Sequence, residues 1–492
     1  MDEQTNRQVD GQMNGRVDKP NRPIAQSSSY LRFIPFGGVG EVTRNLYLYE
    51  TPNDLVAVDC GIGFPPEEEG RSENELLIPD FSYLIANQRK LRALLITHGH
   101  EDHIGAIPYL LKKVRVPVFA ARLPAGMIRE KLRERGPKSS KGGSLSVRQA
   151  GASGGKFEIR EVDDGQRIKL GRDFSFEFIR LTHSIPDTMA IALSTPLGVV
   201  IHTGDFKLDP TPLDRRLAQL GKIEEFGRRG VLLLASDSLR ADREGSCPSE
   251  RIVGEAFFHE IPKTRGRVFI TMFSSDVSRI QQAVDVAAAL GREVTLAGLS
   301  LEKNFNVARD LGYLAVPKKQ VISNEKLKKL PVSQQLILVS GSQGQSNSAL
   351  AKMARGEHRA FKIGQGDLVI FSSDLIPGNE GRVRNIQDDL RGVGAKVLYL
   401  EEIPEIHVSG HAYAEDLKRV LRAAQAQYLV PIGGTPDSMR EYAKMARGFN
   451  YHENQIFLLE AGQILEFYPF KGKAAARLAG RLNLREFSVL QD

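Results

Sequence analysis

Short runs of apolar residues, each bounded by polar or charged residues, recur along the chain from about residue 30 to residue 236. Runs of this length predict strands with at least one buried face. The predicted strands cover residues 30–34, 45–49, 55–59, 91–96, 157–160, 174–179 and 198–202. Apolar residues at helical spacing follow the fourth run, over residues 104–111, and predict a helix there.

Further along, the pattern changes to strands that alternate with helices. Strands are predicted at residues 231–235, 267–271, 293–296, 335–339 and 367–371. Helical segments lie between them, the clearest over residues 277–289. Such alternation is typical of a parallel sheet, so the sequence predicts an inserted α/β domain.

Near residue 395 the chain is predicted to return to the first domain. Strands are expected at residues 395–399 and 428–432, and an amphipathic helix at 415–424. The predicted division is a disordered polar tail (1–29), a first domain in two parts (30–236 and 395–475), an inserted domain (237–394) and a C-terminal tail (476–492). The Gly-, Ser- and Lys-rich residues 136–156 predict a flexible surface loop.

Composition narrows the class of protein. The chain has 492 residues, of which 41% are hydrophobic and 26% charged, as in ordinary globular proteins. Its two cysteines, Cys60 and Cys247, argue against a disulfide scaffold or a Cys-based zinc site and favour the reducing cytoplasm. Neither a long apolar span nor a signal peptide is apparent, so no membrane association is expected. The net charge of +7 favours anionic partners only weakly.

The candidate chemistry centres on residues 97–103, with the sequence THGHEDH, between a predicted strand and a predicted helix. His98 and His100 are two residues apart and can point the same way from an extended chain. Asp102 and His103 can turn toward a second point once the helix begins. Imidazole and carboxylate ligands suit Zn²⁺ or Mn²⁺, and four of them can serve two ions. Three of only 10 histidines fall within these residues, which argues against a chance polar loop.

Two later residues are also placed for metal binding, His183 and Asp205, each just beyond a predicted strand. An isolated histidine or aspartate in such a position more often has a structural role than a metal-binding one. After H-x-H-x-D-H, however, their order resembles that of the metallo-β-lactamase superfamily. Asp59, which ends another strand, is either a turn residue or a partner that orients the histidine loop, and the resemblance favours the second role.

Further motifs narrow the resemblance. They are THSIPD (182–187), HTGDFKLDPTP (202–212), GSQGQ (341–345), MARGEH (353–358), IPGNE (376–380) and HVSGHA (407–412). With residues 97–111 they resemble the ribonuclease J family, in the β-CASP branch of the superfamily, from about Phe33 to Phe467. The resemblance implies an α/β fold: a metallo-β-lactamase αββα sandwich with an inserted β-CASP domain.

The resemblance also implies a ligand set and a reaction. His98, His100 and His183 would hold one ion, Asp102 and His103 a second, with Asp205 bridging. Two divalent ions are expected, Zn²⁺ first, with Mn²⁺ or Mg²⁺ as alternatives. The implied reaction is hydrolysis of RNA phosphodiesters, 5′ to 3′ from a 5′-monophosphate end of single-stranded RNA, with internal cleavage also known in the family.

Catalytic and RNA-binding residues follow from the same resemblance. Asp237 and His411 are the implied catalytic residues, with His411 facing the scissile phosphate. The implied RNA contacts are Ser274, Ser275, Asp276, His407, Val408, Ser409, Gly410 and His411. Glycine at 410 would let backbone N–H groups approach phosphate oxygens. Residues 136–156 are a minority candidate for further RNA contact.

The sequence departs from the family pattern in three places. Gly433 stands where the family has a metal-binding histidine, so the second ion is expected to bind more weakly unless Thr435, Asp437 or a water substitutes. Residues 298–301 lack an arginine of the family. The C-terminal domain of many members is expected to be absent, which leaves open a homodimer or a hetero-oligomer with a sibling ribonuclease.

Three functions are therefore weighed. The first is an active metal-dependent ribonuclease. The second is an RNA-binding partner subunit, catalytically weakened at Gly433. The third is a small-molecule hydrolase. It is disfavoured by the long insert and the HVSGHA motif, because relatives with small substrates need no second domain to hold RNA. This argument rests on the motifs, since fold alone does not decide function.

Overall fold

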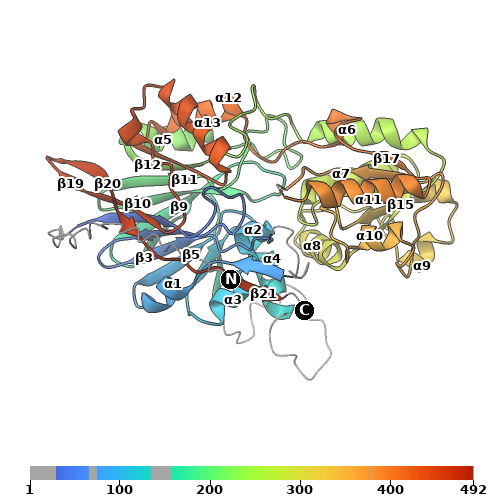
Figure 1. Ribbon diagram of the computed structural model, residues 1–492, viewed down its shortest axis with the longest axis horizontal. Coiled ribbons are helices and arrows are strands. Elements are labelled where there is room, and N and C mark those ends of the chain that lie inside the picture. Colours follow the sequence, from blue (N-terminus) through green and yellow to red (C-terminus); the bar gives the residue numbers. More distant parts are fainter. Residues whose placement is uncertain (1–28, 66–74, 135–156, 377, 491–492) are drawn as a thin grey trace, which may run out of the picture.

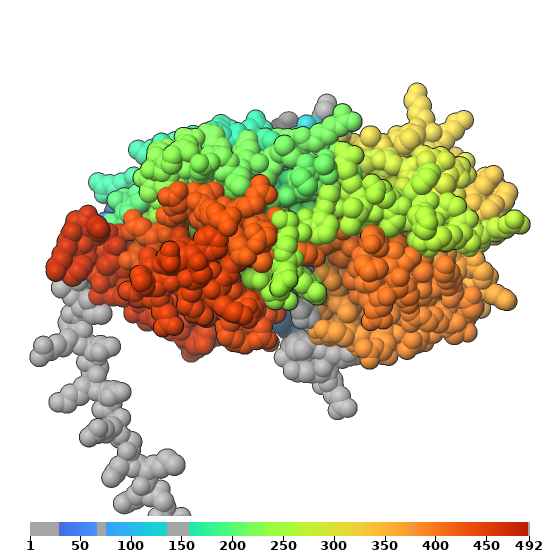
Figure 2. Space-filling model, turned by 90° about the horizontal axis from the view of Figure 1, so that it is seen from above, coloured from blue at the N-terminus to red at the C-terminus, as the bar shows by residue number. Residues whose placement is uncertain are grey.

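The computed structural model describes residues 29–65, 75–134, 157–376 and 378–490. The predicted loop at 136–156 and all but the last residue of the predicted tail at 1–29 lie outside these residues. Figure 1 shows two domains side by side, the first at the left and the inserted one at the right. In Figure 2, the red C-terminal segments lie in the same lobe as the green middle segments of the first domain.

The first domain is built on two sheets that pack face to face. The larger sheet has the strand order β20 (Lys473–Arg481), β19 (Gln463–Phe470), β1 (Leu31–Pro35), β2 (Tyr47–Glu50), β3 (Leu55–Val58), β5 (Leu91–Leu95), β6 (Val118–Ala120), β7 (Ile159–Glu161). The second has the order β18 (Tyr428–Ile432), β12 (Val231–Asp237), β11 (Gly198–His202), β10 (Met189–Thr195), β9 (Phe174–Arg180), β8 (Arg167–Leu170). Phe33, Phe176 and Leu233 belong to the apolar core shared by both sheets.

Helices cover the two outer faces of this sandwich. On the larger sheet lie α1 (Ser82–Ala86), α2 (Glu101–Ile104), α3 (Ile107–Leu111) and α4 (Arg122–Glu134). On the other sheet lie α5 (Leu220–Arg229), α12 (Ala414–Ala424) and α13 (Pro436–Arg447). This arrangement is the αββα sandwich expected from the sequence.

The inserted domain has a five-stranded sheet, parallel throughout, as the alternating pattern predicted. Its strand order is β14 (Glu293–Ala297), β15 (Gln335–Val339), β13 (Val268–Thr271), β16 (Leu368–Phe371), β17 (Lys396–Leu398). Its helices are α6 (Arg251–Glu260), α7 (Val277–Ala289), α8 (Leu299–Asp310), α9 (Asn324–Leu327), α10 (Ala349–Ala354) and α11 (Glu380–Gly392). The predicted helix at 277–289 coincides with α7.

Three expectations need correction. The segment at 395–399 does not return to the first domain, because β17 pairs with β16 in the inserted sheet. An apolar run predicts a strand but not its partner. Residues 476–490 are not a tail, since β20 pairs with β19, and β21 (Phe487–Leu490) pairs with β4 (Glu75–Ile78). β20 has few large apolar residues, and β21 is only four residues long, so neither formed a clear strand pattern. The helix expected at 104–111 is two short helices, α2 and α3.

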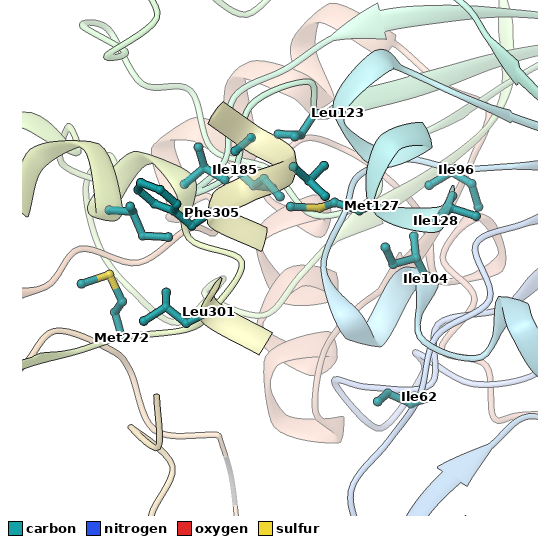
Figure 3. Packing of buried hydrophobic residues seen from close by; sticks show 14 of the residues in the cluster. Ile62, Ile96, Ile104, Leu123, Met127, Ile128, Ile185, Met272, Leu301 and Phe305 are labelled. Atoms are coloured by element: carbon teal, nitrogen blue, oxygen red, sulfur yellow. The ribbon is translucent and has the colours of Figure 1, made fainter. Parts of the chain in front are cut away.

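The domains contact each other where α4 packs on α8. Figure 3 shows Met127 and Leu123 of α4 on one side of α8 and Phe305 and Leu301 on its other side, all within one apolar cluster. Gly126 allows this approach, because a Cβ there would lie 2.6 Å from the Leu311 Cδ1 atom. The interface is therefore close-packed and fixes the two sides of the cleft between the domains.

Replacing Gly126 with valine should destabilise this contact. Overpacking of a filled interface typically costs about 1–3 kcal/mol, which should appear as a lower free energy of unfolding in urea. Gly221→Val in α5 is the matched control, because nothing lies within 4 Å of a Cβ at that position. Equal effects of the two substitutions would contradict close packing at Gly126.

Candidate active site

The histidine loop is anchored by Asp59, which follows β3. Its Oδ1 atom accepts a hydrogen bond from the Thr97 N–H at 2.8 Å. Its Oδ2 atom accepts bonds from the Thr97 hydroxyl and from the His103 Nδ1–H, each also at 2.8 Å. Since Asp59 is fully buried, these bonds fix both ends of the loop. The prediction that Asp59 orients the histidine loop is confirmed.

Thr97 in turn sets the orientation of His98. The Thr97 Oγ1 atom donates to Asp59, so it accepts from the His98 Nδ1–H, at 3.0 Å. The His98 Nε2 atom then carries a free lone pair. It is buried and has no hydrogen-bond partner within the described part of the chain. A buried imidazole acceptor without a partner is an expected feature of a metal ligand.

Two more histidines converge on the same point. The His183 Nδ1–H donates to the Gly410 carbonyl oxygen at 2.6 Å, which leaves the Nε2 lone pair free. The His100 Nε2 atom lies 3.2 Å from the Ser184 Oγ atom, to which it can donate, and this leaves the Nδ1 lone pair free. The free nitrogens of His100 and His183 are only 3.1 Å apart.

Burial keeps these imidazoles neutral. It lowers the pKa of His98 well below its usual range and that of His183 to about 3, with the neighbouring histidines adding to the effect. One ligand atom from each of His98, His100 and His183 lies within 4.8 Å of the others. Lone pairs that face each other at this distance repel, and a divalent cation between them would relieve the repulsion. The three residues therefore fit a metal ion such as Zn²⁺.

A second group lies beside the first. The His103 Nε2 atom is 3.1 Å from the Asp205 Oδ2 atom and 3.5 Å from the Asp102 Oδ2 atom. Burial lowers the pKa of His103, but Asp205 and Asp102 raise it by more, so that it lies well above its usual value. Bound metal would have to displace this proton, which suits a cation site of one imidazole and two carboxylates. Asp205 is also close to His183 and so stands between the two groups.

Asn45 contacts this second group and was not recognised in the sequence. Its Nδ2 atom lies 3.1 Å from the His103 Nε2 atom, while its Oδ1 atom accepts from the Tyr47 hydroxyl at 2.7 Å. Asn45 is fully buried. The only sequence signal was a polar residue between a glycine-rich turn and an apolar strand, and that pattern is common.

Gly433 directly follows β18 and faces Asp205, as expected for the position of the missing histidine. A Cβ there would lie 3.2 Å from the Asp205 Oδ1 atom and 3.6 Å from the Asp237 Oδ1 atom. The suggested substitutes are not in place. The Thr435 hydroxyl accepts from the Ser438 N–H as the N-cap of α13, and the Asp437 side chain is 88% exposed and paired with Arg440. The protein therefore offers the second group no replacement from these two residues.

Replacing Gly433 with histidine should raise the metal content of the second group, because the Cβ atom of the new side chain would lie next to Asp205 and the imidazole could join the ligands there. The φ angle of +65° at this position makes any side chain strained, by about 1–2 kcal/mol. Gly433→Ala carries the same strain without the imidazole and is the matched control. Elemental analysis after dialysis should find more metal in Gly433→His than in Gly433→Ala. Equal contents would mean that the ligand set is complete without position 433.

His411 and Asp237 form a pair at the edge of the metal-competent groups. The His411 Nδ1–H donates to the Asp237 Oδ2 atom at 2.8 Å. Asp237 is held in turn by the N–H groups of Leu239 and Phe206. Burial lowers the pKa of His411, but Asp237 and Asp205 raise it to about 9. His411 is thus a charged donor at neutral pH, with its Nε2–H left for a ligand.

A cleft of about 1060 Å³ separates the two domains and exposes part of this chemistry. From the first domain it is lined by His100, Asp102, His183, Asp205 and His411. The inserted domain contributes Ser274, Ser275 and Asp276, and the 407–410 segment, which reaches His183, contributes His407, Ser409 and Gly410. His98, His103 and Asp237 are buried beneath the surface of the cleft. The predicted site residues therefore gather at one place, although they come from distant parts of the chain.

Two predicted RNA contacts are placed differently from the rest. The Val408 side chain packs in the apolar core, so only its backbone is near the cleft. Asp276 is the N-cap of α7, where its side chain accepts from the Arg279 N–H, and it is almost fully buried. Much of the predicted segment lines the cleft, but the sequence could not show which way each side chain points.

Comparisons with known proteins agree with this geometry. Three family models match: the metallo-beta-lactamase superfamily over residues 39–298, the beta-CASP domain of ribonuclease J over 265–390, and the Zn-dependent metallo-hydrolase RNA specificity domain over 400–457. Ribonuclease J of Thermus thermophilus is 38% identical over 440 residues, which are 88% of this chain and 74% of the relative. The chain belongs to the ribonuclease J family.

Two other ribonuclease J relatives show the same relationship. Ribonuclease J of Helicobacter pylori strain J99 is 38% identical over 90% of this chain, which spans 61% of that relative. Ribonuclease J2 of Bacillus subtilis is 35% identical, over 90% of this chain and 76% of the relative.

A crystal structure of a protein of unknown function from Enterococcus faecalis shares the fold, with a TM-score of 0.57 and 16% identity, over 88% of this chain and 99% of that one.

Membership of the ribonuclease J family confirms the expected fold class, a metallo-β-lactamase domain with an inserted β-CASP domain. It makes the chain a hydrolase of the metal-dependent ribonuclease type with an RNA specificity domain. The small-molecule hydrolase considered from the sequence is set aside. Among the described residues, no helix is long and apolar enough to cross a membrane.

Proposed function

We propose that this member of the ribonuclease J family hydrolyses single-stranded RNA from a 5′-monophosphate end, in the 5′ to 3′ direction, and also cuts internally. The observation that carries the proposal is the convergence of the six predicted metal ligands beside a cleft whose lining also includes most of the predicted RNA contacts. The volume of this cleft is at the upper end of the usual range for small-ligand pockets, and its lining comes from both domains. It suits a polymer that enters between two domains.

We assign the metal ligands by their free lone pairs. The Nε2 atoms of His98 and His183 and the Nδ1 atom of His100 would hold one ion. Asp102 and His103 would hold the second, with Asp205 shared between the two. Bound divalent ions supply an activated water at neutral pH and neutralise charge on the phosphate. Zn²⁺ suits the imidazole-rich first group, while Mn²⁺ or Mg²⁺ suits the more carboxylate-rich second group.

The chain's own residues would complete the chemistry. The His411 Nε2–H would donate to a phosphate oxygen or to the leaving oxygen of the RNA, and Asp237 would hold the ring in position and stabilise its charge. Ser274, Ser275, Ser409 and the backbone at Gly410 would position the RNA backbone at the lining of the cleft.

A second candidate is an RNA-binding partner subunit with weak catalysis. Gly433 favours it, because position 433 adds no side chain to the second group, which within the described residues consists of Asp102, His103 and Asp205. A homodimer, a hetero-oligomer with a sibling ribonuclease, and a cytoplasmic location also stay predictions. Analytical ultracentrifugation, alone and with the sibling, would test the first two.

The deciding experiment measures metal per chain and digestion of a 5′-monophosphorylated RNA with added Zn²⁺ or Mn²⁺. Near two metals per chain and progressive loss of 5′ nucleotides would support the nuclease. A circular RNA of the same sequence isolates internal cleavage, and a 5′-triphosphorylated copy tests the preference for the end. One metal or none, with RNA bound but uncut, would favour the partner subunit.

A further inference from the structure

Three charged residues are buried together beneath the cleft. They are Lys207, which follows β11 in the first domain, Glu250, which precedes α6, and Arg279 of α7. The Lys207 Nζ atom is 2.8 Å from the Glu250 Oε1 atom, and the Arg279 Nη2 atom is 2.8 Å from the Glu250 Oε2 atom. Lys207 and Arg279 are 0% exposed. Buried ion clusters of this kind rarely stabilise a fold more than apolar residues would, so a positional role is the better explanation.

The Lys207–Glu250–Arg279 cluster holds the backbone of residues 407–411. The Arg279 Nη2 atom donates to the Val408 carbonyl oxygen at 3.3 Å, and the Lys207 Nζ atom donates to the Ser409 carbonyl oxygen at 3.2 Å. The next carbonyl, at Gly410, accepts from the metal-competent His183. Three consecutive carbonyl groups are therefore bound by buried donors, which fixes the loop that presents His407 and His411 to the cleft.

Arg279 also decides the tautomer of His407. The Arg279 Nη1 atom lies 2.8 Å from the His407 Nδ1 atom. A guanidinium has no acceptor, so it must be the donor and the His407 Nδ1 atom must be unprotonated. Burial and Arg279 lower the pKa of His407 to about 3, which keeps the ring neutral. Its single proton is therefore on Nε2.

The His407 Nε2–H has no hydrogen-bond partner within the part of the chain that the structure describes. The Asp374 Oδ2 atom lies 3.9 Å from the His407 Nε2 atom, too far for a hydrogen bond, and both residues line the cleft. His407 is only 9% exposed, so leaving this donor unbound is unfavourable. The Nε2 atom itself is buried, so an acceptor atom of the RNA, a phosphate or 2′-hydroxyl oxygen, would satisfy it once the lining of the cleft beside it moves.

We propose that Arg279, held by Glu250 and Lys207, is a positioning residue that fixes the 407–411 loop and keeps His407 as an Nε2–H donor to RNA. The inference rests on the proposed RNA cleavage, but Arg279, Glu250 and Lys207 themselves touch neither the RNA nor the metal. Arg279 connects α7 of the inserted domain to the loop that reaches His183 and His411 of the first domain. Displacement of Arg279 should therefore affect RNA binding and turnover together.

The test replaces Arg279 with lysine, which keeps the charge beside Glu250 but cannot reach Val408 and His407 at the same time. Arg292→Lys is the matched control, because Arg292 is also buried and donates to the carbonyl oxygens of Gly266, Gln335 and Thr264, away from the cleft. Arg279→Lys should lower kcat about tenfold and weaken RNA binding about tenfold, since each lost charged hydrogen bond is worth roughly this factor. Arg292→Lys should leave both unchanged.

Substitutions at His407 distinguish an effect of the Nε2–H donor on RNA binding from an effect of side-chain packing. His407→Gln keeps an N–H donor near the place of Nε2, whereas His407→Asn can turn its Oδ1 acceptor toward Arg279 but is too short to bring its N–H donor to the place of Nε2. RNA affinity, measured by fluorescence anisotropy, should therefore be retained better by His407→Gln. Bound metal, measured in every variant, should not change. Equal effects of Arg279→Lys and Arg292→Lys on kcat and on RNA affinity would overturn the proposal.

The two readouts keep this inference apart from the proposed function. If the unmodified protein binds RNA but does not cut it under any metal condition, the proposed nuclease fails. The positioning role is then decided by RNA affinity alone. If the unmodified protein cuts RNA and Arg279→Lys behaves like its control, the nuclease stands and the positioning role fails.

Discussion

Replacing His100 with alanine should abolish RNA hydrolysis while leaving RNA binding nearly intact. The His100 Nδ1 atom faces the His183 Nε2 atom at 3.1 Å, and its loss removes one of the three free lone pairs of the first group. Loss of this ligand should weaken binding of the metal ion that would stabilise negative charge in the transition state, and loss of such stabilisation lowers kcat on the order of 10³-fold or more. Initial rates on a 5′-monophosphorylated RNA would measure the loss, and fluorescence anisotropy would measure the binding.

The matched control for this substitution is His259→Ala, which removes a histidine whose side chain is 74% exposed, on α6. It should change neither rate nor affinity. Elemental analysis of the His100→Ala protein should show less bound metal. Retained hydrolysis with full metal content would exclude the assigned role of His100, whatever the fate of the other ligands.

Replacing Asp237 with asparagine should lower kcat by about 10²- to 10⁴-fold, the usual contribution of a positioned acid or base. The substitution keeps the shape of the side chain but removes the charge that faces His411. Burial opposes protonation of His411, while Asp237 and Asp205 raise its pKa to about 9, so the ring is protonated below that pH. Without the charge of Asp237 the pKa should fall, and the alkaline limb of the pH profile of kcat should move to lower pH.

The control for the Asp237 variant is Asp437→Asn, because Asp437 is an exposed carboxylate of α13. Its pH profile should match that of the unmodified protein. His411→Ala should lose the alkaline limb altogether, since the titrating group is gone. An unchanged limb in Asp237→Asn would show that a group other than His411 is responsible for it.

Much of the fold was open to prediction from local pattern. The helix at 277–289 and the helix ending at Ala424 were expected to within one residue, because each has a long amphipathic or apolar repeat. The strand at 428–432 was also expected where it lies. The errors came from short or weakly hydrophobic segments. For β17 the partner strand was wrong, and β20 and β21 were not recognised as strands.

The sequence by itself determined the metal-competent residues and the family, because the histidine loop and the later motifs are local and specific. It could not determine the contacts that make these residues work. His183 is held by the carbonyl of Gly410, 227 residues away, and Asp59 holds Thr97 and His103. Tautomers, pKa values and the buried Lys207–Glu250–Arg279 cluster depend on burial and on partners brought together only when the two domains pack. Tertiary structure alone decides those.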